Sequence, residues 1–569
     1  GPSRKDYGDA LMRIEPVSGV RLSNSPAVEA FLFDFEKVAP AYEYNWSRQE
    51  SFAARAAYLN GGGYRGDRAA LAAALTAYNQ ALGAGPSTFD SIRKLAEESA
   101  LAVVTGQQAG IFTGPAYSIY KAMTAIRLAR LQTERLGVPV VPVFWVAGED
   151  HDWHEVSWIL TPAGDSVERV ALQEHFEGDR RSVALAPAPE SLPEAITAFL
   201  ALLPDTEFKE GVAERIRAAA EAAPALDPAL TDGRPTLADW FARLITWLFA
   251  GTGLVVVNSA DPAIRRLEAS FFARAIRQHE EVGTALAEGY ALCDSLGFKA
   301  TVERQLGNIN LFMYAGGQRL PIMGAGAHFW LRDQEESGWS TEELVDMALS
   351  HPERFSTNVV LRPVVQGALF PDLALVGGPG EISYFGLYRQ VFRAMGQQMP
   401  IVYPRESFTL VEPPLARILE KQGLTLADAF LRLEEKKQEL LEREDRLGIP
   451  ELFSQFRANF DELYGQLVDK VLLLDANLRF VTEENRKQIA VQIGKLEEKA
   501  RQQHRKNCEV AIRQFDRLKG QLTPGGLQER SVSFLPYMAK YGPDLVGRLL
   551  EETEFRLDGW EHRAVYLGT

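Results

Sequence analysis

The fold is decided by residues 101–115, which read LAVVTGQQAGIFTGP. The first four residues are apolar and partly β-branched, which is typical of a buried strand. Gly106 and Gly110 let the backbone turn sharply and leave its N–H groups open to a ligand. Gly114 and Pro115 then predict the entry to a helix. A strand, a glycine loop and a helix in this order suit an anion at the positive N-terminus of the helix.

The glycine spacing fits neither the dinucleotide-binding fingerprint nor the phosphate loop of nucleoside triphosphatases, so a tight turn without a ligand is the alternative interpretation. The next predicted strand favours a ligand-binding site over a purely structural turn. Residues 138–146 (VPVVPVFWV) are continuously apolar, like the strands of a parallel sheet. Directly after them come Glu149, Asp150, His151, Asp152, His154 and Glu155. Open α/β sheets bind ligands at this position, outside the carboxyl ends of their strands.

Later strands are predicted to end at the same edge of the sheet. Residues 253–258 predict a strand that ends at Asn258, and residues 373–381 predict a strand that runs into a glycine loop before a helix. We therefore expect one substrate site at this edge. Its expected residues are Thr105, Gly106, Gln107, Gln108, Gly110, Glu149, Asn258, Gly377, Gly378 and Glu381.

Several strings resemble those of the BshC family, the cysteine ligases of bacillithiol biosynthesis. They are TGQQAGIFTGPAYSIYK at 105–121, VPVFWVAGEDHD at 141–152, NVVLRPVVQ at 358–366, VGGPGEISY at 376–384 and LQER at 527–530. The resemblance extends over nearly the whole chain. It implies an enzyme that joins L-cysteine to the amine of glucosaminyl malate. It also implies an α/β fold, with a Rossmann-like core of the class I synthetase type and two connecting-peptide insertions.

The resemblance further implies a nucleotide pocket, holding ATP or bound ADP, where a helical domain meets the core. The matching positions here are Arg405, Glu406, Ser407, Gln528 and Arg530. Arginines at both places suit phosphate, which their planar guanidinium groups can bind bidentately. The alternative is an interdomain salt bridge with Glu406 or Glu529.

Forming an amide requires an activated carboxylate, for which ATP is the usual source, and an amine that loses a proton. Asp150, His151, Asp152 and His154 are the candidate proton acceptors. A carboxylate such as Glu149 or Glu381 could recognise the ammonium group of cysteine. The chain lacks the HIGH tetrad and the KMSKS loop of class I synthetases. Cleavage of ATP to AMP and cleavage to ADP are therefore both open.

Two other classes of function are compatible with parts of the sequence. His151, His154 and the neighbouring carboxylates could hold a divalent metal for an amidase or another hydrolase, although HDWHE fits no standard ligand spacing. A non-catalytic coiled-coil scaffold would explain residues 415–520 but not the polar loops at one sheet edge. We predict no metal.

The repeated apolar positions of residues 415–520 predict an antiparallel helical coiled coil. Leucines recur every seven residues from Leu426 to Leu447, and a second apolar pattern from 452 to 478 continues loosely to Leu518. Gly448-Ile449-Pro450 separates the two predicted helices. The seam is wider than one antiparallel partner requires, so we expect a homodimer through this domain.

The rest of the chain is assigned around these elements. The predicted order is a helical cover at 1–100, core segments at 101–159, 236–289 and 341–414, insertions at 160–235 and 290–340, the coiled coil at 415–520, and a C-terminal segment at 521–569 that returns to the core. In the second insertion, residues 309–314 and a Gly316-Gly317 turn predict a small antiparallel sheet.

Composition limits the partners. The formal net charge is −15, with a pI near 5.3, which argues against nucleic-acid binding. No apolar run approaches the length of a membrane span, so no membrane association is expected. The 2 cysteines, Cys293 and Cys508, provide no disulfide framework, which fits a reducing cytoplasm.

Overall fold

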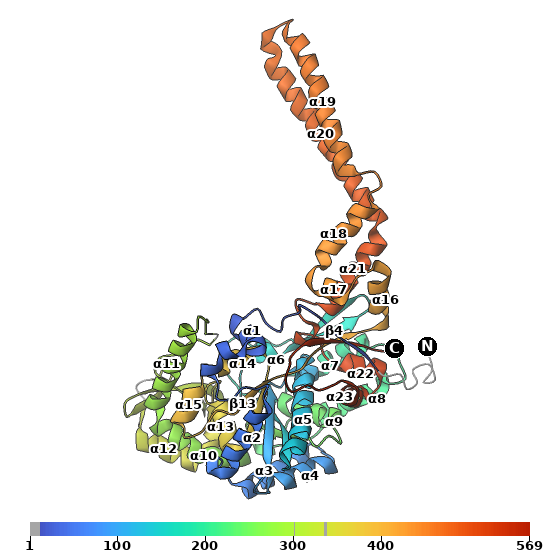
Figure 1. Cartoon of the computed structure of the whole chain (residues 1–569). Coiled ribbons are helices and arrows are strands. Elements are labelled where there is room, and N and C mark those ends of the chain that lie inside the picture. Colours follow the sequence, from blue (N-terminus) through green and yellow to red (C-terminus); the bar gives the residue numbers. More distant parts are fainter. Residues whose placement is uncertain (1–11, 301, 335–337, 569) are drawn as a thin grey trace. The chain divides into compact units, whose positions relative to one another are not determined.

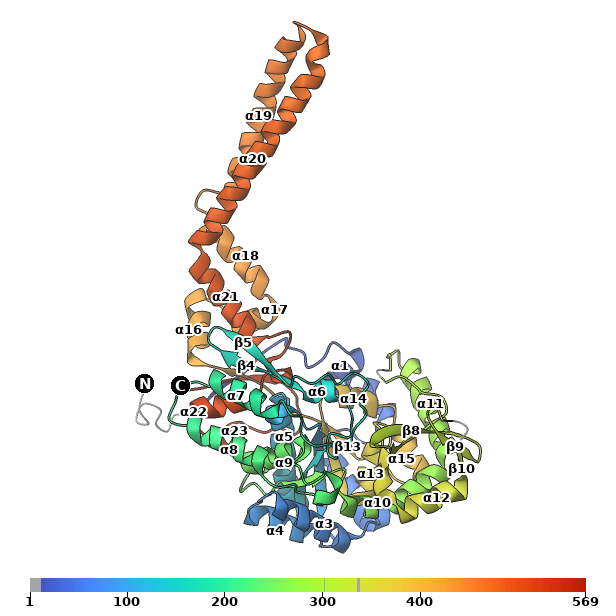
Figure 2. The same ribbon diagram turned by 180° about the vertical axis from the view of Figure 1, so that it is seen from behind.

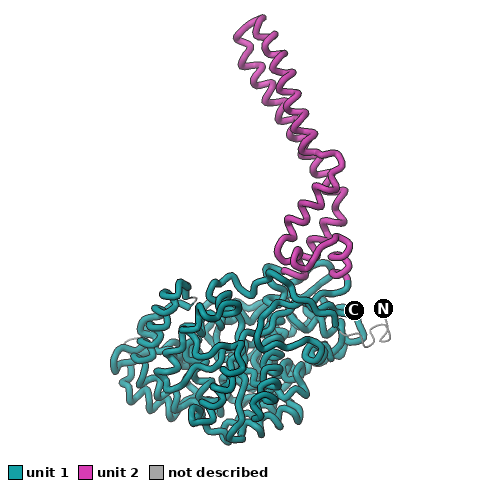
Figure 3. Tube along the Cα trace, in the orientation of Figure 1, with its two compact units in different colours: residues 1–413, 524–569 teal, residues 414–523 magenta. Residues whose placement is uncertain are grey.

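The computed structural model describes residues 12–300, 302–334 and 338–568. The chain divides into two units, coloured separately in Figure 3. The first contains the residues up to Pro413 and from Pro524 onward, and the second contains Pro414–Thr523. The first unit is therefore discontinuous in sequence, with the second unit inserted into it.

A parallel five-stranded sheet forms the centre of the first unit (Figure 1). Its order is β13-β12-β2-β3-β6, with β2 at Leu101–Gln107, β3 at Val140–Val146, β6 at Val255–Asn258, β12 at Asp372–Gly377 and β13 at Ile401–Pro404. The chain starts at the central strand, builds outward to β6, and then returns to the other side of β2. This doubly wound order confirms the predicted Rossmann-like fold, and its switch point lies between β2 and β12.

Apolar side chains cover both faces of this sheet. In β3, Val143 and Trp145 enter one buried apolar cluster, whereas Phe144 and Val146 enter another. Successive side chains of a strand point to opposite faces, so a strand buried on both sides must be apolar throughout. Helix α5 (Tyr117–Leu136), which links β2 to β3, packs on both of these strands.

The N-terminal part of the first unit is only partly the helical cover expected for residues 1–100. It contains α1 (Pro26–Phe33), α2 (Gln49–Tyr58), α3 (Arg68–Ala81) and α4 (Pro86–Leu95). It also contributes β1 (Arg13–Pro16), which pairs antiparallel with β15 (His562–Tyr566). Strand β15 in turn runs parallel to β14 (Ser407–Val411). Strand β1 was not predicted, because four residues are too few for alternating apolar and polar side chains to indicate a strand.

Both insertions contain short strands, which were expected for the second. The first has the hairpin β4 (Trp158–Ala163) and β5 (Ser166–Ala171), followed by α7 (Leu192–Leu202) and α8 (Lys209–Glu221), all visible in Figure 2. The second is an antiparallel sheet of β10 (Gly338–Ser340), β9 (His328–Leu331), β8 (Gln318–Ala325), β7 (Asn308–Ala315) and β11 (Phe355–Thr357).

The second sheet extends beyond the predicted boundary at residue 340, because α12 (Thr341–Ser350) leads into its edge strand β11. Gly316 and Gly317 have φ values of 57° and 77°, as the expected two-residue hairpin turn requires. The apolar stretch after β11 then forms a helix, α13 (Arg362–Leu369), before the chain re-enters the parallel sheet.

The second unit is a helical coiled coil, but its chain reversal differs from the prediction. Its helices are α16 (Pro413–Gln422), α17 (Leu426–Leu431), α18 (Leu433–Glu444), α19 (Ile449–Leu472), α20 (Arg479–Asn507) and α21 (Glu509–Leu522). Helix α19 pairs with α20, and α18 pairs with α21. The expectation of one helix running from 452 to 518 is wrong, because the chain reverses at residues 473–478. There the side chain of Asp475 accepts a hydrogen bond from the N–H of Asn477.

Gly448 marks an offset between α18 and α19 and not a reversal. It adopts the left-handed conformation, with φ 61° and ψ 52°, at the start of α19. None of the described helices combines the length and apolar character needed to cross a membrane.

A substitution at Gly106 tests how closely β2 and β3 approach each other. A Cβ atom at this position would lie 2.7 Å from the carbonyl oxygen of Trp145 in β3. We expect Gly106→Ala to destabilise the first unit by about 1–3 kcal/mol, the usual cost of forcing an extra group into a packed interior. Chemical denaturation measures the change.

The matched control is Gly211→Ala in α8, where nothing lies within 4 Å of the added Cβ atom. It should be neutral or stabilising. Equal stability of the two variants would show that β2 and β3 are not as close at this point as described.

Candidate functional site

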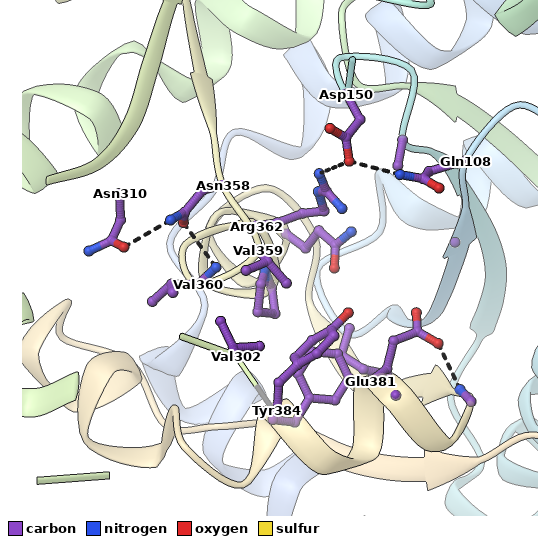
Figure 4. Close-up of a pocket in the computed structure, with 18 of the residues that line it drawn as sticks. Gln108, Asp150, Val302, Asn310, Asn358, Val359, Val360, Arg362, Glu381 and Tyr384 are labelled. Carbon is purple, nitrogen blue, oxygen red and sulfur yellow. Dashed lines mark hydrogen bonds and ion pairs between the residues drawn. The ribbon is translucent and has the colours of Figure 1, made fainter. Parts of the chain in front are cut away.

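A cavity of about 810 Å³ opens at the carboxyl ends of β2, β3 and β12, next to the switch point of the sheet. Figure 4 shows part of its wall. Ten of the predicted site residues line it: Thr105, Gly106, Gln107, Gln108, Asp150, His151, Gly378, Glu381, Arg405 and Arg530. The loops therefore assemble into one site, as open α/β sheets favour.

Nine predicted residues do not line this cavity: Gly110, Glu149, Asp152, His154, Asn258, Gly377, Glu406, Ser407 and Gln528. Most hold the surrounding structure. Asp152 caps the short helix α6 (Trp153–Val156) by accepting from the N–H of Glu155. Asn258 is buried and accepts from the N–H of Ala260.

The glycine loop after β2 anchors the chain and does not form an open anion cradle. Phe112 is fully buried and stacks on Phe199 of the first insertion, with ring centroids 4.0 Å apart. A Cβ atom on Gly110 would lie 2.9 Å from the Cα atom of Gly114, so Gly110 permits a tight contact within the loop. This half of the loop is therefore a tight turn packed against the first insertion.

The start of α5 is likewise satisfied by the chain itself. The helix begins at Tyr117 and not directly after Pro115, and the N–H groups of Ser118 and Ile119 donate to the carbonyls of Pro115 and Ala116. These two N–H donors are thus engaged within the turn, and the N–H of Ala116 donates to the carbonyl of Val532. Tyr117 itself lines the cavity.

Lys121, near the start of α5, lines the cavity. It was not among the residues predicted from the sequence. Its buried ammonium group donates to the carbonyl of Gly106 (3.0 Å) and to Oε1 of Gln107 (2.9 Å), and it pairs with Oε2 of Glu381 (2.5 Å). Glu381 also accepts from the N–H of Gly378 (2.7 Å). Lys121 therefore joins the loop after β2 to the loop after β12.

Asp150 lies at the centre of a charged cluster. Its carboxylate accepts from the side-chain amide of Gln108 (2.9 Å) and faces Arg362 at 3.7 Å (Figure 4). It also faces Arg319 at 3.4 Å. Burial alone would raise the pKa of Asp150, but the two arginines and the hydrogen bonds to the carboxylate lower it to about 2. Asp150 is therefore a stable anion and a weak base at neutral pH.

His151 is held by the same arginine. Arg319 comes from β8 of the second insertion, and its Nη1 donates to Nδ1 of His151 (3.2 Å). Burial and the charge of Arg319 lower the pKa of His151, so the imidazole is neutral. With Nδ1 accepting this hydrogen bond, the ring proton lies on Nε2. His151 is thus arranged as a hydrogen-bond donor.

Arg319 is fixed by the antiparallel sheet. Its Nε donates to the hydroxyl of Ser356 (2.9 Å), its Nη2 donates to the carbonyl of Thr357 (2.7 Å), and its guanidinium group lies 3.8 Å from the ring centroid of Phe312. The second insertion therefore places a cation against the loop that follows β3.

Glu149, expected to recognise an ammonium group, is fully buried and supports Arg362. Nε of Arg362 donates to its carboxylate (3.0 Å), and Ser259 hydrogen-bonds to its other oxygen. The buried ion pair raises the pKa of Arg362, although burial by itself would lower it. Arg362 is the first residue of α13 and was missed, although it lies in the NVVLRPVVQ string.

Most of the residues assigned to the nucleotide pocket hold the first unit together. Arg405 pairs with buried Glu529 (2.8 Å), which is one of the two salt bridges considered as the alternative, and the pair lies within the first unit. Ser407 donates to the same carboxylate, and Gln528 exchanges hydrogen bonds with the backbone of Leu410. Glu406 pairs with Arg127 and Arg563. Of these five residues, only Arg405 and Arg530 line the cavity.

Among the described residues, no group of three or more His, Cys, Asp or Glu side chains is placed to hold a metal ion. In the HDWHE segment, His151 faces the cavity, whereas Asp152 and His154 are exposed outside its lining. Of the two histidines named for the metal-hydrolase alternative, only His151 therefore lines the cavity.

The sequence has clear relatives. Residues 12–406 match the family described as "Bacillithiol biosynthesis BshC, N-terminal Rossmann-like domain", and residues 408–567 match its "C-terminal coiled-coil domain". A protein of Symbiobacterium thermophilum named "Putative cysteine ligase BshC" is 63% identical over 98% of this chain and 100% of its own length. Proteins of the same name from Desulforamulus reducens and Heliobacterium modesticaldum are 34% and 37% identical, over 98% and 81% of this chain and 100% and 83% of their own lengths.

The ion pairs of Asp150 predict a pH-dependent contribution to stability. Because its pKa in the folded state, about 2, lies below the ordinary 3.8, the contribution is present above about pH 4 and is lost as the pH falls toward 2. We expect Asp150→Asn to destabilise the protein by about 2 kcal/mol at pH 7 and by less at pH 3.

Denaturation at both pH values, compared with the exposed control Asp205→Asn, measures this difference. An equal loss of stability at pH 7 and pH 3 would show that the charge of Asp150 is not what the arginines stabilise.

Proposed function

The chain belongs to the BshC family of bacillithiol biosynthesis, and on that premise we propose that it is a ligase that joins L-cysteine to the amine of glucosaminyl malate. In this proposal ATP is consumed to activate the carboxylate of cysteine, and the product is an amide. L-Cysteine, glucosaminyl malate and ATP are then the small-molecule partners of the cavity.

The charge of the cavity wall carries this proposal. Six cationic side chains line it, against four carboxylates: Lys121, Arg304, Arg319, Arg362, Arg405 and Arg530. Every proposed substrate is anionic, through the carboxylate of cysteine, the malyl carboxylates or the phosphates of ATP. The planar guanidinium group binds both carboxylates and phosphates bidentately, and a buried setting strengthens the interaction. The volume of about 810 Å³ is also within the usual range for small-molecule sites.

The cations divide into two groups. Arg319 and Arg362 surround Asp150 on the side of β3 and the second insertion, and we assign substrate carboxylates to them. Arg405, which lies near Gly378, and Arg530 also line the cavity, and we assign the phosphates of ATP to them. Charge that develops on the leaving phosphate would be stabilised by these fixed donors.

The direct test incubates the purified protein with L-cysteine, glucosaminyl malate and ATP and detects bacillithiol by mass spectrometry. Separating the nucleotides distinguishes the two forms of activation: ADP accompanies an acyl phosphate, and AMP accompanies an acyl adenylate. We expect product only when all three substrates are present. Product formation without ATP would overturn the proposed activation, and no product from the unmodified protein would overturn the function.

Arg530 allows a test of the phosphate assignment, because Arg405 is needed for its buried pair with Glu529. We expect Arg530→Ala to raise the KM for ATP about 10- to 100-fold, since a hydrogen bond to a charged group contributes about 1.5–3 kcal/mol. Arg217→Ala, which breaks only an exposed ion pair in α8, is the control. An unchanged KM for ATP in both variants would remove Arg530 from the nucleotide site.

We also propose that the second unit mediates a homodimer. Helix α19 exposes large apolar side chains at Leu452, Phe456, Leu463 and Leu467, although it already pairs with α20 through Ile449, Phe453 and Ile493. An exposed apolar stripe of this kind marks an interaction surface. The heptad leucines Leu433 and Leu440 are buried inside the unit and cannot contribute to the stripe.

Replacing Leu463 and Leu467 together by Glu should therefore convert dimers to monomers in sedimentation experiments. The control is Ser454→Glu with Ala458→Glu, a pair of exposed positions with the same spacing on the same helix. A monomer in the unmodified protein, or a dimer that survives the leucine substitutions, would contradict this assignment.

A further inference from the structure

The proposed reaction needs a proton acceptor, and the geometry makes the expected acceptors poor ones. Asp150 is fixed as an anion by Arg319 and Arg362. Nδ1 of His151 already accepts a hydrogen bond from Arg319, and its Nε2 carries the ring proton. Neither group can readily take a proton from an incoming amine. The remaining carboxylates of the cavity wall are Glu155, Glu303 and Glu381. Of these, Glu303 belongs to the segment before β7, outside the loops that follow the parallel strands.

Glu381 is also committed. One of its carboxylate oxygens pairs with the ammonium group of Lys121 and accepts from the N–H of Gly378. A carboxylate that holds a buried lysine and a helix N-terminus in place cannot change protonation without disturbing both.

Glu155 differs from these residues. It lies on α6, directly after the loop of β3, and its side chain lines the same cavity. The backbone N–H of Glu155 is capped by Asp152, which fixes the start of the helix. Among the described residues, none donates a hydrogen bond or forms an ion pair with its carboxylate, so both oxygens are open to the cavity.

The charges around Glu155 also favour proton uptake. The carboxylate of Glu155 is accessible, but the wall around it partly removes it from water. This desolvation, followed by the negative charges of Asp152 and Asp150 on the same loop and, more weakly, of Glu381 on α14 (Pro379–Phe385), raises the pKa of Glu155 above its ordinary value, whereas the ammonium of Lys121 opposes the shift. The phenols of Tyr117 and Tyr384 face the same region and remain neutral, because burial raises their pKa values.

We propose that Glu155 is the general base of the ligase reaction, an assignment that rests on the function proposed above. The neutral amine of glucosaminyl malate attacks the activated carbonyl carbon of cysteine. The new C–N bond takes the electron pair of the nitrogen, and one N–H proton moves to the carboxylate of Glu155. The C–O bond to the phosphate-bearing group breaks, and that group leaves with the electron pair of the bond.

The test compares Glu155→Gln and Glu155→Asp with the unmodified enzyme in the three-substrate assay, with kcat and KM measured from about pH 5 to 9. Glu155→Gln should lower kcat by about 10²–10⁴-fold, the usual effect of removing a general base, with little change in the KM for cysteine. The rise of kcat with pH, which follows deprotonation of the base in the unmodified enzyme, should disappear. Glu155→Asp should recover part of the rate.

Glu168→Gln, an exposed carboxamide substitution on β5 outside the cavity, is the matched control and should leave the kinetics unchanged. A raised KM for cysteine with unchanged kcat would make Glu155 an ammonium-binding residue and overturn the base assignment. Full activity of Glu155→Gln would overturn it as well. If the unmodified enzyme forms no product, the proposed function fails, and the base assignment fails with it.

Discussion

The buried ammonium group of Lys121 is the interaction on which the cavity depends. A charge removed from water must be paired and hydrogen-bonded, and its three partners come from the end of β2 and from the start of α14. The carbonyl of Gly106, the amide oxygen of Gln107 and the carboxylate of Glu381 therefore have fixed positions. These elements lie on the two sides of the switch point, so Lys121 connects the two halves of the sheet edge where the strand order reverses.

The second constraint is the distribution of charge among the carboxylates. Glu149 and Asp150 are adjacent in sequence, yet Glu149 is buried under Arg362 whereas Asp150 reaches the cavity between two arginines. Both serve to orient cations. The same pairing that makes Asp150 a good anchor makes it a poor base, so proton transfer is left to a carboxylate with no cationic partner. Glu155, which follows Asp150 in sequence and lies on α6, is such a carboxylate.

The parallel sheet and the loops that line the cavity were predictable, because continuous apolar strands ending in polar loops have few other interpretations. Asp150, Gln107 and Glu381 were found in this way. Lys121 and Arg362 were not found, because they lie on helices. In the sequence of a helix, a single lysine or arginine that faces a site cannot be told from one that faces solvent. Arg319 depends on how an insertion folds back onto the core, which local sequence does not encode. The heptads of the second unit likewise indicated coiled-coil helices but not the reversal at residues 473–478.

The discontinuity of the first unit has a consequence for how the chain folds during synthesis. Strand β15 pairs with both β1 and β14, and Arg13 is opposite Tyr566 in that register. The helices of the second unit, whose contacts are local, emerge from the ribosome before β15 does and can form first. The three-stranded sheet, in contrast, closes a loop of almost the entire chain and must wait for the last strand. Until then, the edges of β1 and β14 lack their partner, and a nascent chain that stalls after the coiled coil exposes them to aggregation.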